Sequence, residues 1–192
     1  MKHKRQIVFV KCALGIVLLS SCSDTDQVSN AATSPTPAQT GSSQNQANGW
    51  NPIEACGYLS GVSNLQTRGY KNKYEDVFGC SSPYKEINAG SALANNLAYY
   101  VDGDAQTATQ LKLVLNVNQA QQSKEAHAAL LSSSQDLTQK SLGSALPKDV
   151  SSAILSGKAG KWTIGKAQVD LKRENFQTGK GYELHFIIKR KG

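Results

Sequence analysis

The sequence predicts an α+β domain in which an antiparallel sheet of about four strands packs against helices, in the order α-ββ-αα-ββ. Apolar residues alternate with polar ones in two separate regions, which is typical of strands with one solvated face. Segments with helical composition lie before each of these regions. Turn residues separate the strands within each region, so the strands are expected to pair as antiparallel neighbours.

The domain is expected to begin with a short helix. Asn51 is a favourable N-cap, and Pro52 suits the first helical position because its missing N–H would have no partner there. Glu54 places a carboxylate in the first turn, three residues past the cap. The pattern predicts a helix from Pro52 to about Ser60, ended by Gly61.

Residues 62–96 show no regular periodicity and are rich in aromatic side chains. A loop of this length is uncommon unless it is cross-linked or functional. Tyr70, Tyr74 and Tyr84 are the candidate binding residues, because tyrosine gives a large contact area at a small cost in conformational entropy. The alternative is that these aromatic side chains only cover one edge of the core.

One strand is expected before Asp102-Gly103-Asp104 and another after it, because these three residues favour a turn. The alternating apolar positions are Leu97, Tyr99 and Val101 before the turn, and Leu111, Leu113, Leu115 and Val117 after it. This pattern predicts a hairpin with one buried face.

Two helices are expected next. The composition of residues 119–142 favours a helix that stops at Gly143. Its apolar stripe is weak and contains serines, so we expect it to lie on one face of a sheet. His127 lies beside this stripe and is expected at the surface or its boundary. Leu146-Pro147 opens a shorter helix that ends at Gly157.

The remaining strands follow the second helix. Trp162 and Ile164 share one face, and the alternation changes phase at Gly165, which predicts a bulge. The segment 182–188 has the clearest alternation in the chain. We expect this strand at a sheet edge, where it could accept a partner strand, although the lysines and arginine that follow it are typical guards against such pairing.

The first 22 residues have the layout of an export signal. Lys2, Lys4 and Arg5 precede an apolar run of about 13 residues, shorter than the roughly 20 that a membrane-spanning helix needs. Small residues and a cysteine follow. Leu19-Ser20-Ser21-Cys22 resembles the lipobox of bacterial lipoproteins, in which cleavage precedes the cysteine and that cysteine carries the lipid.

The resemblance implies a signal peptide over residues 1–21 and acyl chains on Cys22 that attach the protein to a membrane. Two or three chains would make the attachment durable, since one alone binds weakly. Ser23, in place of the Asp that favours inner-membrane retention in Gram-negative families, favours the outer membrane over the inner membrane. Residues 22–50 are expected to be a flexible tether, because they contain few apolar side chains, and residues 51–192 a single domain.

The charge of the chain argues against a nucleic-acid partner. The formal charge is +7, but four of its 21 Lys and Arg residues lie in the expected signal peptide. The remaining 17 basic residues face 14 acidic ones, so the mature chain carries about +3. We therefore expect the partners to be the membrane and an envelope protein.

Two cysteines remain in the expected domain, Cys56 and Cys80. Cysteines of exported proteins usually pair, so a disulfide is predicted between them. A metal site would need more ligands at suitable spacing, and His127 and His185 are far away in the sequence. The sequence therefore predicts neither a metal site nor a cofactor.

No motif of a known catalytic type is present, and no catalytic residue is assigned. Glu183 and His185 lie two residues apart on one strand face, where a general base and its orienting carboxylate could lie, but no nucleophile is evident beside them. The preferred interpretation is a non-catalytic, membrane-anchored protein-binding or assembly module. The alternative is a small envelope hydrolase or a cell-wall glycan binder.

Overall fold

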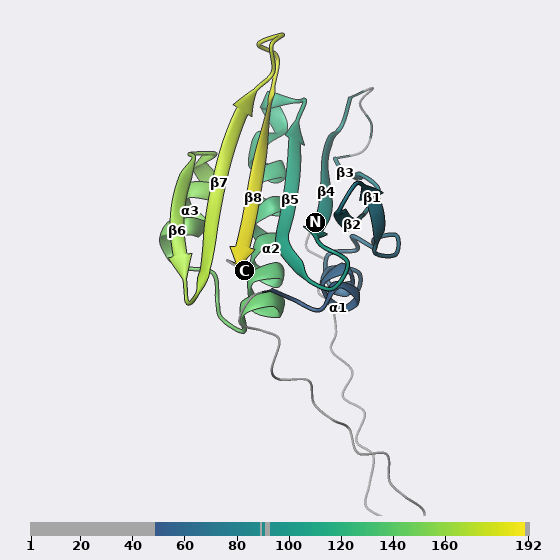
Figure 1. Ribbon diagram of the computed structural model, residues 1–192. Helices are drawn as coiled ribbons and strands as arrows, with labels where there is room; N and C mark the ends of the chain where they lie inside the picture. The colour runs from purple at the N-terminus through teal and green to yellow at the C-terminus, as the bar shows by residue number, and fades with distance from the viewer. Residues whose placement is uncertain (1–48, 89, 91–92, 191–192) are drawn as a thin grey trace, which may run out of the picture. The chain divides into compact units, whose positions relative to one another are not determined.

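The computed structural model of the protein describes residues 49–88, 90 and 93–190. The helices in these ranges are α1 (Pro52–Gly57), the 3-10 helix η1 (Ala120–Gln122), α2 (Ser123–Leu142) and α3 (Lys148–Ser156) (Figure 1). The strands are β1 (Lys71–Tyr74), β2 (Val77–Ser81), β3 (Lys85–Ile87), β4 (Asn95–Gly103), β5 (Ala108–Val117), β6 (Gly160–Ile164), β7 (Ala167–Asn175) and β8 (Tyr182–Arg190).

All paired strands are antiparallel, and seven of the eight described strands form one path in the order β1-β2-β4-β5-β8-β7-β6. The short strand β3 pairs with β4 beside β2. β4 and β5 form a hairpin, and β6, β7 and β8 are joined in succession by short turns. β5 pairs with β8, so the two halves of the domain meet in the middle of the sheet.

The core lies between the sheet and a layer of helices on one of its faces. In Figure 1, α2 lies behind β5 and α3 lies behind β6. Alternate residues of the long strands point into this layer and are almost completely buried, as the hydrophobic effect favours. Among them are Leu97, Tyr99, Val101, Leu111, Leu113, Leu115, Val169, Leu171, Leu184 and Phe186.

The buried face of α2 is unusually polar. Ser133, Ser134, Thr138 and Ser141 are buried beside its leucines. The Thr138 hydroxyl donates to the carbonyl of Ser134 at 2.7 Å, and the Ser141 hydroxyl donates to the carbonyl of Leu137 at 2.6 Å. Because the Thr138 and Ser141 hydroxyls bond to the helix itself, they can be buried at a small cost, whereas the buried Ser134 hydroxyl has no hydrogen-bond partner among the described residues. This explains why the apolar stripe of the helix is weak in the sequence.

The predicted α+β arrangement of about four strands in the order α-ββ-αα-ββ is wrong. The structure is mostly an eight-stranded antiparallel sheet, with α2 and α3 as its longer helices. The largest difference lies in residues 62–96, where β1, β2 and β3 form in a segment expected to be irregular. All four residues of β1 are exposed and β3 has only three residues, so neither has an apolar alternation that the sequence could reveal.

Two other strand predictions are also corrected. The phase change at Gly165 is a tight turn and not a bulge, because Ile164 pairs with Ala167 and only two residues connect β6 to β7. Gly165 has a φ of 59°, which glycine adopts without strain. The strand predicted at a sheet edge, β8, lies between β5 and β7, so both of its sides are already paired.

Candidate functional site

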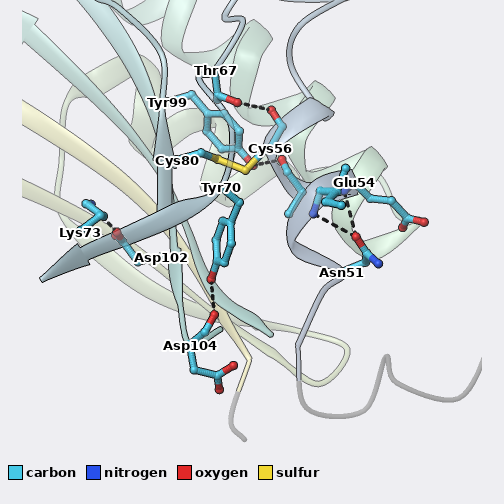
Figure 2. Close-up of a disulfide and its surroundings, with 12 residues drawn as sticks. Asn51, Glu54, Cys56, Thr67, Tyr70, Lys73, Cys80, Tyr99, Asp102 and Asp104 are labelled. Atoms are coloured by element: carbon cyan, nitrogen blue, oxygen red, sulfur yellow. Dashed lines mark hydrogen bonds and ion pairs between the residues drawn. A yellow bond between two sulfur atoms is a disulfide. The ribbon is translucent and has the colours of Figure 1, made fainter. Parts of the chain in front are cut away.

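A disulfide joins α1 to β2. Cys56 and Cys80, the two cysteines expected to pair, are bonded, and their Cα atoms are 6.2 Å apart. Figure 2 shows the bond beside Tyr99 of β4, between the short helix and the small strands. The bond fixes the start of the domain to the part of the sheet that has the fewest buried side chains. We call residues 52–88, which contain α1, β1, β2, β3 and their connections, the disulfide flank.

Polar contacts to the backbone hold the disulfide flank in addition to the covalent bond. The Thr67 hydroxyl donates to the carbonyl of Cys56 at 3.0 Å, and the Lys85 ammonium donates to the carbonyl of Ser63 at 2.9 Å. The Tyr99 hydroxyl donates to the carbonyl of Ala55 at 2.8 Å, which connects α1 to the core (Figure 2). The first two bonds satisfy carbonyls outside regular pairing, whereas the Ala55 carbonyl also accepts from the Tyr58 N–H at 3.3 Å.

The disulfide flank exposes large apolar side chains. Of the six large apolar residues that are more than half exposed in the described part of the chain, four belong to it: Ile53 (80% exposed), Val62 (54%), Tyr74 (62%) and Tyr84 (56%). The other two are Leu93 and Leu155. Exposed apolar residues are common when scattered, so the two that line hollows on the flank, Ile53 and Tyr84, are the ones that indicate an interaction surface.

Two adjacent hollows lie on the disulfide flank. The first is lined by Ile53, Cys56, Gly57, Ser60, Gln66, Thr67, Gly69 and Tyr70. The second is lined by Asn64, Leu65, Gln66, Thr67, Arg68, Ser82, Pro83, Tyr84 and Lys85. Gln66 and Thr67 line both, so the two hollows form one continuous surface from Ile53 to Tyr84. This surface combines apolar side chains with amide and hydroxyl groups.

Tyr70, one of the three predicted binding residues, has a structural role in this surface. Its hydroxyl donates to the carbonyl of Asp104 at 2.8 Å, and its ring stacks on Phe78 with the ring centres 6.3 Å apart. Burial, followed by the charges of Asp104 and Asp102, raises the pKa of Tyr70 to about 12. The side chain therefore fastens the flank to the turn after β4 while one side of it lines the first hollow.

The other two predicted tyrosines are exposed. The Tyr84 hydroxyl accepts a hydrogen bond from the Tyr100 hydroxyl at 3.1 Å, and its ring lines the second hollow. Burial, and then the bond to Tyr84, raises the pKa of Tyr100. Tyr74 lies on β1 and lines neither hollow. The structure thus places Tyr70 and Tyr84 on one continuous surface and Tyr74 outside it.

Ile53 and the pair Gln66-Thr67 belong to this surface but were not identified from the sequence. Ile53 is the second residue of α1, after the cap Asn51 and Pro52. An apolar residue in the first turn of a six-residue helix has no periodic partner, so the sequence could not indicate whether it faces the core or the solvent.

A polar cluster lies on the face of the sheet that is opposite to the helices. His185 Nε2 is 2.7 Å from Glu183 Oε2, so the contact expected from their spacing is present. The residues that pair directly with these two positions on the neighbouring strands are Val114, Asn116, Lys172 and Glu174. None of these four carries a hydroxyl or thiol that could act as a nucleophile.

His127 is buried, which differs from the expected surface position. Its Nδ1 lies 2.9 Å from the carbonyl of Leu155, and its Nε2 lies 2.7 Å from the Tyr182 hydroxyl. Because a carbonyl only accepts, Nδ1 carries the proton and Nε2 of the neutral ring accepts from Tyr182. His127 therefore connects α2, the end of α3 and β8, and both of its nitrogens are used in this structural role.

Comparisons with protein-family models, with curated proteins and with solved structures find no match to this chain. Among the residues that the structure describes, no helix has the length and apolar character needed to cross a bilayer. The functional argument therefore rests on the surfaces described above.

Proposed function

We propose that the protein is a membrane-anchored envelope lipoprotein whose folded domain binds another envelope protein and does not catalyse a reaction. The observation that carries this proposal is that Ile53 and Tyr84, both more than half exposed, line two adjacent hollows on the disulfide flank. A patch of this kind is costly to expose to water unless a partner covers it for part of the time.

The construction of the flank supports recognition of a protein. Tyr84 and Ile53 offer apolar contact area, and Gln66 and Thr67 offer hydrogen-bonding groups between them. Interfaces of non-obligate complexes combine aromatic anchors with polar groups in this way. Because the disulfide and the bonds to backbone carbonyls already order the flank, little conformational entropy would be lost on binding.

The anchor in this proposal is the acylated Cys22, which lies outside the described residues. Because Trp50 is buried in the domain, the tether in this proposal is the 26 residues 23–48, and a flexible coil of that length has a root-mean-square span of about 30 Å. The domain could therefore contact partners at some distance from the membrane surface. Ser23 favours attachment to the outer membrane over the inner membrane, as the lipobox resemblance implies.

Cross-linking in the native envelope, followed by mass spectrometry, tests the binding surface. We expect one envelope protein to be captured by the wild type and capture to fall about tenfold in Ile53→Ala and Tyr84→Ala, the loss typical of an interface anchor. Leu155→Ala is the matched control, because Leu155 is also exposed and apolar but lies on α3. Equal capture by all variants, or labelling of cell-wall glycan and no protein, would contradict the proposal.

Intact-mass measurement of the membrane-extracted protein tests the anchor. We expect a chain that begins at Cys22 and carries acyl groups, and Cys22→Ala should lose membrane attachment while the domain keeps its thermal midpoint. An unmodified mass, or a chain that still contains Met1, would exclude lipidation.

A further inference from the structure

Three side chains that can bind a metal ion meet near the tip of the β7–β8 hairpin, which Figure 1 shows extending beyond the neighbouring strands. They are Glu174 of β7 and Glu183 and His185 of β8. One ligand atom from each lies within 4.8 Å of the others. The Glu183 side chain is 31% exposed and the His185 side chain 16%, and Glu174 is exposed, so solvent and ions can reach the group.

The strand register forces two like charges together at this point. Glu174 and Glu183 are directly opposite each other in the pairing of β7 with β8. Like charges in such positions destabilise a sheet. Glu174 forms no hydrogen bond or ion pair with any described side chain, whereas Asp102 on the same sheet is paired with Lys73 at 2.8 Å. Two opposed carboxylates, only one of them with a partner, therefore share a small volume beside an imidazole.

We propose that Glu174, Glu183 and His185 bind a divalent transition-metal ion. Zn²⁺ binds carboxylate oxygen and imidazole nitrogen at about 2.0–2.2 Å, which places tetrahedral ligands about 3.3–3.5 Å from one another. The ligand atoms of the three residues lie within 4.8 Å of one another, so small side-chain rotations would bring them to this separation, and His185 Nε2 and Glu183 Oε2, at 2.7 Å, would move slightly apart. The ion would neutralise the opposed carboxylates and join the two strands.

The ligand types select the class of metal. A histidine ligand favours zinc and its neighbours in the transition series, whereas Ca²⁺ and Mg²⁺ prefer oxygen alone. The residues next to the site are apolar on one side, since Val114 pairs with His185 and Ile187 follows it on the same face, and both are buried. An apolar border lowers the local dielectric constant and strengthens the interaction between the ion and its ligands.

Three protein ligands leave at least one coordination position for water or for a group on a partner. In the metal-free protein Nε2 carries a hydrogen, because its partner Glu183 is a carboxylate that only accepts. When the ion binds, this proton moves to Nδ1 or leaves for solvent, and Nε2 donates its lone pair to the metal. The proposal does not rest on the protein-binding surface, whose hollows are lined by residues of α1 and of the connections around residues 64–70 and 82–85.

Equilibrium dialysis of Zn²⁺ against the full mature protein in detergent, stripped of metal with a chelator, tests the site. We expect one Zn²⁺ per chain, and affinity at least about tenfold lower in Glu174→Gln and in His185→Ala. Glu86→Gln is the matched control, because Glu86 is an exposed glutamate on another antiparallel strand. The absence of Zn²⁺ binding by the wild type, or equal binding by all variants, would overturn the proposal.

Thermal unfolding separates loss of the site from loss of the fold. The metal-free Glu174→Gln protein should unfold at the wild-type temperature or slightly above it, because the substitution removes the repulsion between two carboxylates. Zn²⁺ should raise the midpoint of the wild type and of Glu86→Gln but not that of Glu174→Gln. A midpoint that Zn²⁺ raises equally in all three proteins would place the ion elsewhere, and equal binding of Mg²⁺ would exclude the transition-metal class.

Discussion

The disulfide flank and the main sheet, which consists of β4 to β8 with α2 and α3, are stabilised by different forces. The main sheet buries alternate apolar side chains of long strands, such as Leu113 and Phe186, against the helices. The flank contains short strands and one six-residue helix, and a disulfide and hydrogen bonds to backbone carbonyls hold it. The fold of the flank therefore does not depend on the burial of all its large apolar side chains.

This difference indicates how one small domain can provide both stability and a recognition surface. In the main sheet the side chains that face the helices are buried, so a change at one of them also changes the core. In the flank the covalent bond and the backbone contacts fix the conformation, and side chains such as Ile53 and Tyr84 remain available to a partner. Tyr99 connects the two regions, because its ring is in the core and its hydroxyl bonds to α1.

The largest effect is expected from a truncation in the main sheet. Phe186 is fully buried on β8, so Phe186→Ala should lower the free energy of unfolding by about 3–5 kcal/mol. Urea denaturation measures this. Tyr84→Ala in the flank should change the same quantity by less than about 0.5 kcal/mol, since the side chain is exposed. Similar losses in both variants would remove the distinction between the regions.

The second effect concerns the disulfide. Replacing both Cys56 and Cys80 by serine should reduce the free energy of unfolding by about 3 kcal/mol, because the bond closes a loop of about 25 residues in the unfolded chain. Hydrogen exchange should accelerate first in β1 and β2 and remain slow in β5 and β8. Uniform acceleration across the sheet would show that the flank and the main sheet unfold as one unit.

The connection between the two regions can be weakened by removing one atom. Tyr99→Phe keeps the ring in the core but removes the closer of the two donors to the Ala55 carbonyl, which keeps only the Tyr58 N–H at 3.3 Å. We expect a loss of about 1–2 kcal/mol in the free energy of unfolding. Tyr84→Phe, which removes an exposed hydroxyl, is the control and should be close to neutral. If both substitutions have the same small effect, the bond to α1 does not contribute to stability.

A smaller effect is expected at alkaline pH. Because the folded state raises the pKa of Tyr70 to about 12 from an ordinary value of 10, the neutral hydroxyl favours the fold. This contribution is complete below pH 10 and is lost as the pH rises from 10 towards 12. Ultraviolet absorbance titration of the wild type and Tyr70→Phe should show that Tyr70 ionises late. Ionisation near pH 10 would mean that its hydroxyl is not held by Asp104.

The sequence predicted the main sheet much better than the flank. The sequence identified the β4–β5 hairpin, the α2 helix capped by Gly143, and the strand that begins at Tyr182. In these elements the spacing of the apolar residues indicates which positions are buried. The flank strands could not be found in this way. β1 is exposed on both faces, so its residues carry no alternation, and it becomes a strand only because β2 offers backbone partners.

The candidate sites show the same limit. The spacing of Glu183 and His185 predicted their contact, since residues two apart on a strand share a face. Glu174 was missed because its position depends on the register of the β7–β8 hairpin, which one strand alone does not define. Tyr70 was expected to be a binding residue, but its bond to Asp104 depends on a contact 34 residues away in the chain.

The most direct test of the recognition surface is photo-cross-linking in the native envelope from one position in each region. A photoreactive amino acid replaces Tyr84 in the flank or Leu155 on α3, and both positions are exposed and apolar in the wild type. We predict that position 84 yields a cross-link to one envelope protein, that position 155 does not, and that unlabelled wild-type protein competes for the product. Equal cross-linking from both positions, or none from position 84, would contradict the account.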